Sequence, residues 1–273
     1  MPELPASVRL SLWTTYAWSS GTIAGTNAGT SSGTSSGSRS WLDDVLRRAL
    51  PDLDHVAGDL DRLTVWHEMG EQALLVALPS PGDLSGIPAA SAAAQAIAAE
   101  VGECVFVPGV GGMLVPTMSS YGSGSGGSLD LGTRVDWTAY DADPVPRHRL
   151  EALEPSQLER HLREAIAAAT ASLDAVGGQP FGATAARELA DAALGGRWGL
   201  PPGLPGRPAR VIGLAGTVSQ VVDVALEAGD GALTVTTAAA RHTVLLRLRR
   251  AADEALAAAT NAACAVLAGW RPA

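Results

Sequence analysis

Apolar and polar positions alternate along several short runs in the first half of the chain, and this period of two predicts strands. The first run, 8–17, places its large apolar side chains on one face. Two runs, 63–69 and 73–79, flank the stretch G-E-Q, which predicts a hairpin. Three further strands are predicted at 104–108, 112–118 and 134–140.

Two helices are predicted to interrupt these strands. The first covers 41–50, where Ser40 is the expected N-cap residue, Arg47 and Arg48 occupy the last turn, and Pro51 ends the helix. The second covers 89–101 and consists mostly of alanine. Its small face predicts close packing against the sheet.

After about residue 146 the pattern changes to a helical period. Helices are predicted at 156–177, 184–194, 208–226 and 237–267, with a strand considered only at 232–235. Gly213 and Gly216 lower the helix propensity within the third of these helices, which suggests that another backbone lies close to them. The second half is therefore expected to be helical.

Two tracts of Ser, Thr and Gly, at 19–38 and 119–129, predict flexible loops because they offer little apolar surface to bury. The fold class predicted from these patterns is α+β, with an N-terminal, mostly antiparallel sheet, two helices and a C-terminal α-helical bundle. We expect an α+β sheet domain at 1–145 and a helical domain at 146–273, either separate or docked as one body.

Composition narrows the classes of function. The chain is 47% hydrophobic, which excludes disorder along its whole length, and all 19 of its basic residues are arginine. We interpret that bias as the mark of a high-GC genome. The net charge of −9 argues against nucleic acid as a partner.

Location is predicted from the same sequence. The opening M-P-E-L-P-A-S lacks the basic start and apolar run of a signal peptide, and the best membrane-span candidate, 255–270, is short and contains polar residues. We therefore expect a cytoplasmic protein that uses no membrane. Cys104 and Cys264 each lie in an apolar stretch and are predicted to be buried thiols.

Three charged motifs are not expected to carry a metal or a nucleic acid. H-E-M-G-E at 67–71 lacks the second histidine of a zinc-protease helix, and the acidic run at 52–61 lacks calcium-loop spacing, so it is predicted to be a solvated linker. In the basic run at 241–250, Arg249 and Arg250 are expected to pair with Asp253 and Glu254. We expect neither metal nor cofactor.

The loop at 79–88, A-L-P-S-P-G-D-L-S-G-I-P in its context, carries an apolar strand to the start of an alanine-rich helix. Ser80, Gly82, Asp83 and Ser85 are the candidate ligand-binding residues, because amides at a helix start can receive an anion. The alternative is that the prolines stiffen a crossover, with Asp83 or Ser85 bonding backbone amides in a turn.

No catalytic residue is assigned from the sequence. There is no G-x-S-x-G elbow, and the five histidines are scattered. The leading hypothesis is a non-enzymatic interaction or regulatory protein, with a second copy or another protein as its partner. The alternative hypothesis is a binder of a small anionic molecule, or an enzyme, that uses the loop at 79–88.

Three segments carry a resemblance: P-S-P-G-D-L-S-G-I-P, V-D-W-T-A-Y, and the helix that begins T-A-A-A-R-H-T-V. From Trp41 onward the chain resembles uncharacterised, alanine- and arginine-rich proteins of high-GC actinobacteria. The resemblance implies a source and a cytoplasmic location, and it carries no activity, cofactor or site residue. The insert at 19–38 is expected to be peculiar to this sequence.

Overall fold

The computed structural model describes residues 3–21, 36–121, 132–147, 155–176, 188, 198–227 and 234–272, and it has the predicted α+β class. The chain divides into two compact units. The sheet unit comprises Pro5–Ala152, Gly199–Leu204 and Ala263–Ala273, and the helical unit comprises Met1–Leu4, Leu153–Trp198 and Pro205–Ala262.

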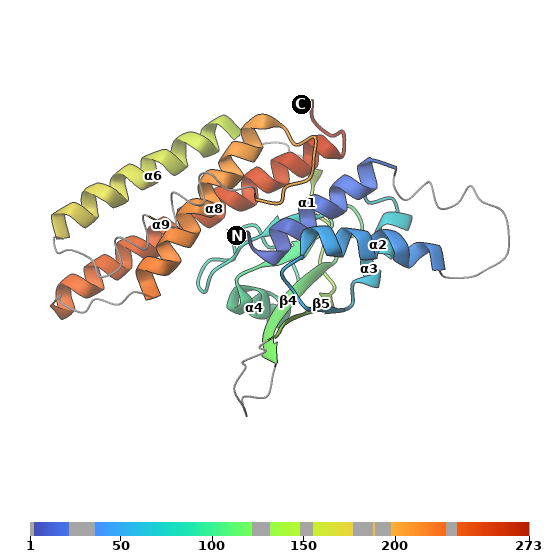
Figure 1. Ribbon diagram of the computed structural model, residues 1–273, viewed down its shortest axis with the longest axis horizontal. Helices are drawn as coiled ribbons and strands as arrows, with labels where there is room; N and C mark the ends of the chain where they lie inside the picture. The colour runs from blue at the N-terminus through green and yellow to red at the C-terminus, as the bar shows by residue number, and fades with distance from the viewer. Residues whose placement is uncertain are drawn as a thin grey trace. The chain divides into compact units, whose positions relative to one another are not determined.

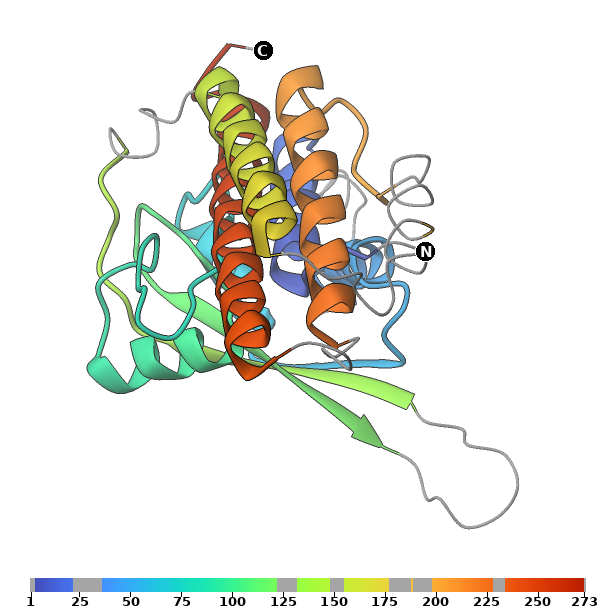
Figure 2. The same ribbon diagram turned by 90° about the vertical axis from the view of Figure 1, so that its left-hand side faces the viewer.

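The sheet unit contains a five-stranded sheet in the order β1-β5-β4-β3-β2, in which only the β1–β5 pair is parallel. Its elements in chain order are α1 (Ala6–Ser19), α2 (Ser36–Ala49), β1 (His55–Gly58), α3 (Asp61–Glu68), β2 (Leu75–Ala77), α4 (Ala92–Val101), β3 (Cys104–Phe106), β4 (Met113–Tyr121) and β5 (Gly132–Tyr140). The strands β4 and β5 are labelled in Figure 1. The paired strands β4 and β5 extend beyond the rest of the sheet as a ribbon (Figure 2).

Several sequence predictions in this unit are confirmed. The strands expected at 104–108, 112–118 and 134–140 are β3, β4 and β5, and the helices expected at 41–50 and 89–101 are α2 and α4. The predicted N-cap Ser40 is wrong, because α2 begins four residues earlier, at Ser36. Ser91 instead caps α4, where its Oγ accepts a hydrogen bond from the amide of Ala94.

The strand predicted at 8–17 is wrong, because these residues belong to helix α1. Val8, Leu10 and Leu12 are fully buried, but so are the polar residues between them, such as Ser11 and Thr15. Both hydroxyls donate to the backbone carbonyl of Leu74, at 2.6 and 3.2 Å. A helix buried on all sides shows no amphipathic period, so the alternation carried no information about faces.

The hairpin predicted from 63–69 and 73–79 is half wrong. Leu75–Ala77 forms β2, but 63–68 lie in the helix α3, which buries Leu63 and Trp66 one turn apart. Gly70, which was interpreted as the start of a hairpin turn, has a φ of +97° and follows the helix end. Glycine serves equally in a hairpin turn and after a helix, so its presence could not distinguish the two.

The solvated linker predicted at 52–61 is also wrong in part, because His55–Gly58 pairs with β5 as strand β1. The acidic residues around it tie it to the unit. Asp54 and Asp59 accept hydrogen bonds from the amides of Thr133 and Ala139, each at 2.8 Å, and Asp52 pairs with the guanidinium of Arg9. These carboxylates hold an edge strand in place.

The core of the sheet unit includes both cysteines, as predicted. Cys104 and Cys264 are free thiols with no exposed surface. Burial raises the pKa of Cys104 to about 12 and that of Cys264 to about 11. Both therefore stay protonated near neutral pH, as structural thiols do.

The helical unit contains α6 (Pro155–Val176), α8 (Gly206–Glu227) and most of α9 (Val235–Leu267), which lie side by side in Figure 2. These match three of the four helices predicted for the second half. The fourth, at 184–194, lies outside the described residues except for Glu188. The strand considered at 232–235 is not formed at Val235, where α9 begins.

The close approach expected at Gly213 and Gly216 exists, but it is made by side chains rather than by another backbone. A Cβ at Gly216 would lie 2.7 Å from Leu4 Cδ2 and 3.0 Å from the Trp198 ring, and one at Gly213 would lie 3.3 Å from Trp198 Nε1. Glycine therefore provides room for the Trp198 indole against α8. The two glycines therefore predicted correctly that another group lies close to α8, but they did not indicate that this group is a side chain.

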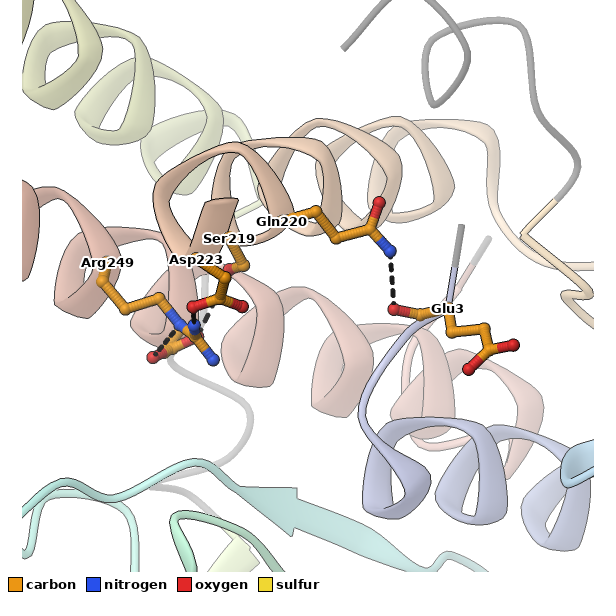
Figure 3. A network of polar contacts seen from close by, with 6 residues as sticks. Glu3, Ser219, Gln220, Asp223 and Arg249 are labelled. Atoms are coloured by element: carbon orange, nitrogen blue, oxygen red, sulfur yellow. Dashed lines mark hydrogen bonds and ion pairs between the residues drawn. The ribbon is translucent and has the colours of Figure 1, made fainter. Parts of the chain in front are cut away.

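A polar cluster joins α8 to α9 (Figure 3). Arg249 on α9 pairs with Asp223 on α8, and its Nε lies 3.0 Å from both carboxylate oxygens of Asp253. Ser219 donates to Asp253 at 3.3 Å. The predicted pairs of Arg249 with Asp253 and of Arg250 with Glu254 are confirmed.

One helix in the described part of the chain, α8, is long and apolar enough to cross a membrane by length and composition. Length and composition are weak evidence for a membrane span, because buried core helices meet the same two criteria. Helix α8 is a different segment from the window at 255–270 that the sequence favoured. Of the predicted flexible tracts, Ser19 ends α1, 36–38 begin α2 and 119–121 complete β4; residues 22–35 and 122–129 lie outside the described residues.

Candidate functional site

The loop predicted as a ligand site is a well-connected turn at the surface of the sheet unit. Gly82 and Ser85 are exposed, and Ser80 and Asp83 are half-buried. Ser80 and Asp83 exchange two backbone hydrogen bonds, of 2.8 and 3.2 Å. Asp83 Oδ1 accepts from the Ser85 amide at 3.0 Å and from the Ser85 hydroxyl.

This geometry corresponds to the turn role that the sequence left open for Asp83. The side chain closes an Asx turn within its own loop, as aspartate commonly does. A ligand role for Ser80, Gly82, Asp83 and Ser85 stays a prediction.

A different place in the sheet unit combines a cavity with charged and aromatic side chains. The Glu71 pocket, as we call it, has a volume of about 310 Å³. Its lining residues are Met69, Gly70, Glu71, Gln72, Pro108, Gly109, Val110, Val145, Arg147 and Trp270. They come from four segments of the chain: the end of α3, the β3–β4 loop, the segment after β5 and the end of α9.

The end of α3 delivers Glu71 to the pocket. The amide of Gly70 donates to the His67 carbonyl at 2.9 Å and the amide of Glu71 to the Trp66 carbonyl at 3.0 Å, with Gly70 in the left-handed region. This is a Schellman motif, which turns the chain sharply as the helix ends. Glu71 is therefore positioned by the backbone of the helix end.

The end of α9 delivers Trp270 in the same way. Gly269 has a φ of +72°, its amide donates to the Val266 carbonyl at 3.0 Å, and the Trp270 amide donates to the Ala265 carbonyl at 2.9 Å. Trp270 thus occupies the same place after α9 that Glu71 occupies after α3. Two helix-terminating motifs, far apart in sequence, supply facing parts of one pocket.

The Glu71 side chain is 4% exposed and its carboxylate faces the β3–β4 loop. Oε1 accepts a hydrogen bond from the amide of Val110. A Cβ at Gly109 would lie 2.8 Å from that oxygen, so a larger residue there would displace the carboxylate. Burial raises the pKa of Glu71, although the loop amides and the charge of Arg147 oppose the shift.

Arg147 provides the cation of the pocket. Its guanidinium lies 4.3 Å from the centre of the Trp270 ring, within cation–π distance. Gln72 Oε1 joins the two residues: it accepts from Trp270 Nε1 at 3.0 Å and from Arg147 at 3.4 Å. The backbone supports this arrangement, since the Val145 amide donates to the Pro108 carbonyl at 2.9 Å.

Sequence reasoning missed most of this site. Glu71 was considered only as part of H-E-M-G-E, and Arg147 and Trp270 carried no motif. The available signal was the glycine directly before Glu71 and the glycine directly before Trp270, although the run before Gly70 was predicted to be a strand. Nothing in the sequence indicated that the two helix ends meet.

The pocket suits an organic molecule better than a metal ion. Glu71 is its one carboxylate, and within the described ranges no group of three or more His, Cys, Asp or Glu side chains could hold a metal ion. Trp270, Met69 and Val145 provide apolar walls, and Arg147 and Gln72 provide polar groups that can orient a ligand.

Fold and site together define an α+β protein of two units with a small pocket in its sheet unit. Two family models match the chain: Rv1486c-like protein, N-terminal domain, over residues 7–152, and Rv1486c-like protein, C-terminal domain, over residues 156–257. The chain belongs to the Rv1486c-like protein family. Comparisons with curated proteins and with solved structures gave no match.

The family supports the resemblance to uncharacterised proteins of actinobacterial type, and its description names no activity, ligand or partner. The actinobacterial source and the cytoplasmic location stay predictions.

Proposed function

We propose that this protein is a non-enzymatic binding protein that holds a small organic molecule in the Glu71 pocket. The observation that carries the proposal is the stacking of the exposed Arg147 on Trp270 at the pocket wall, next to a buried carboxylate. A cation over an aromatic ring and a carboxylate with a shifted pKa in one cavity are features of small-molecule binding sites.

The size and lining of the pocket support this proposal. A volume of about 310 Å³ is at the lower end of the range for small-molecule sites. The half-exposed Trp270 ring and the exposed Met69 offer apolar contact, while the Gln72 amide offers a hydrogen-bonding group. A ligand with a small apolar body and one polar end fits these walls.

The titratable groups in the pocket favour binding over catalysis. Glu71 and Arg147 are the titratable lining residues, and the ten lining residues include no Ser, Thr, Cys or His. Glu71 is engaged with the β3–β4 loop, and Arg147 remains a cation at any ordinary pH. This set orients a ligand and offers no activated nucleophile.

Binding can be tested by nuclear magnetic resonance with ¹⁵N-labelled full chain and a fragment library containing anionic, neutral and cationic members. The expected result is that some fragments shift the amides of Gly70, Gln72 and Val110 together with the Trp270 indole N–H. Trp270→Ala should remove these shifts. Tyr140→Ala, an aromatic change outside the pocket lining, is the control and should leave them in place. A library that shifts no pocket signal contradicts the proposal.

The interaction role expected from the sequence has one observation in its favour. Val65 and Met69 are four positions apart where α3 ends, and they are 40% and 61% exposed. They therefore form an exposed apolar pair beside the pocket. Light scattering on the purified chain tests self-association. A dimer that becomes a monomer in Val65→Ser/Met69→Ser, but not in Leu84→Ser, favours this second candidate.

A further inference from the structure

The open side of the Glu71 pocket presents a guanidinium with donors to spare. Among the described residues, the side-chain hydrogen bond that Arg147 makes is the one to Gln72 Oε1, which is long at 3.4 Å. A guanidinium has five N–H donors in a planar fork that matches a carboxylate. The guanidinium carbon lies 4.3 Å from the centre of the Trp270 ring, and this contact uses none of the N–H donors.

Glu71 does not fill this place. Its Oε1 is held by the amide of Val110, and the side chain is buried against the β3–β4 loop. Arg147 acts on it through charge. The guanidinium therefore shares the pocket with the carboxyl group of Glu71 and keeps N–H donors for an anion that enters from the exposed side.

We propose that the occupant of the pocket is a small organic carboxylate that docks on Arg147, and that its binding takes up a proton at Glu71. The inference rests on the proposed function and names the ligand class of the same site. Both parts follow from one arrangement, in which Arg147 and the buried Glu71 line the same pocket.

The proton uptake has a simple electrostatic reason. The charge of Arg147 favours the ionised form of Glu71. A ligand carboxylate bound to Arg147 offsets this stabilisation and adds a second negative charge near Glu71. The pKa of Glu71, already raised by burial, then rises further in the complex. By linkage, affinity for the carboxylate increases as the pH falls.

Other titratable groups near Glu71 are few among the described residues. On α3, His67 donates from Nδ1 to the backbone carbonyl of Glu71 at 3.1 Å, and Glu68 is exposed. On the α9 side, Arg271 follows Trp270 in the chain. Gly109 and Val110 contribute no titratable side chain. His67 is therefore the other titratable side chain in contact with Glu71.

The test is a titration of the full chain with phenylacetate and with its neutral isostere phenylacetamide, followed at the Trp270 indole and Val110 amide signals. Phenylacetate is expected to bind about tenfold or more tightly than the amide. Arg147→Gln should remove that preference. Arg62→Gln, which removes an exposed arginine outside the lining residues, should retain it.

The proton linkage is tested by repeating the phenylacetate titration between about pH 5.5 and pH 8. Affinity should rise as the pH falls in the wild type. Glu71→Gln keeps an acceptor for the Val110 amide and imitates the protonated acid, so it should bind phenylacetate more tightly than the wild type at the highest pH and with little pH dependence. A pH dependence that persists in this variant places the proton at another group and overturns the linkage.

The remaining outcomes separate the two proposals. Equal binding of phenylacetate and phenylacetamide at the pocket overturns the carboxylate inference and leaves the proposed function standing. Failure of both probes while other fragments shift the pocket signals also overturns the inference alone. Failure of every fragment and both probes overturns the proposed function as well.

Discussion

The carboxylate of Glu71 accepts a hydrogen bond from the amide of Val110, 39 positions further along the chain. This contact fastens the end of α3 to the β3–β4 loop and sets the inner wall of the Glu71 pocket. The carboxylate is buried where the loop backbone comes closest, at Gly109. The stability of the loop should therefore depend on this one side chain.

Replacing Glu71 by alanine should lower the free energy of unfolding of the sheet unit by about 1 to 3 kcal/mol, because the Val110 amide loses its buried acceptor. Glu71→Gln keeps an acceptor oxygen and should cost less. Urea denaturation of the three proteins measures the difference. An alanine variant as stable as the wild type would show that water replaces the carboxylate without loss.

The contribution of Glu71 should also depend on pH. Burial raises its pKa in the native state above that of the unfolded chain, so the native state binds more protons between the two values. The unfolding free energy of the wild type, taken relative to Glu71→Gln, should therefore fall as the pH rises from about 4 to the native-state pKa. It should be constant above that pKa. Denaturation across this pH range checks the sign, and an increase with pH contradicts it.

Gly70→Ala should destabilise the sheet unit by about 1 kcal/mol, because an L-residue is strained at a φ of +97°. A Cβ there meets no atom within 4 Å, so the cost is one of backbone conformation and not of collision. Gly206→Ala is the matched control. Gly206 begins α8 without a positive φ, so alanine should be neutral or stabilising there.

Arg249→Ala should destabilise the helical unit by about 1 to 2 kcal/mol, since it leaves Asp223 and Asp253 facing each other without their cation. The figure is modest because the Arg249 side chain is one-third exposed. Arg250→Ala removes an exposed i,i+4 contact with Glu254 and should cost less than about 0.5 kcal/mol. Hydrogen exchange of the α8 amides reports the difference. Equal effects of the two changes would contradict the conclusion that Arg249 stabilises the contact between α8 and α9.

Asp83→Ala distinguishes the two candidate sites. The side chain caps the Ser85 amide in an exposed loop, so its loss should cost at most about 1 kcal/mol and leave binding in the Glu71 pocket unchanged. If the loop at 79–88 is the ligand site instead, this variant should abolish a rise in melting temperature that an anionic ligand causes. Melting curves of the wild type and the variant with phenylacetate compare the two.

The helical half and β5 were predictable because their patterns reflect local preference and a buried face. The helices α6, α8 and α9 follow the 3.6-residue period, and β5 buries Val135 and Trp137 on one face. In β4, by contrast, the first four residues are buried and the last five are exposed. The elements that were misjudged, α1, β1 and α3, lie in the sheet unit, where tertiary contacts outweigh the local sequence pattern. Polar positions of α1 are buried because the Leu74 backbone accepts their hydroxyls.

The Glu71 pocket also separates what local sequence determines from what tertiary contacts determine. The sequence by itself determined the fold class and the buried thiols, since each depends on short-range propensity or on hydrophobicity. The helix-ending role of Gly70 was not among these, because the same residues were predicted as a hairpin. Only the tertiary structure decided that Glu71, Arg147 and Trp270 share a pocket. Arg147 and Trp270 each lie at least 76 positions from Glu71 in the chain. Contacts at that separation depend on how helix ends meet in space, and no local pattern of residues encodes this meeting.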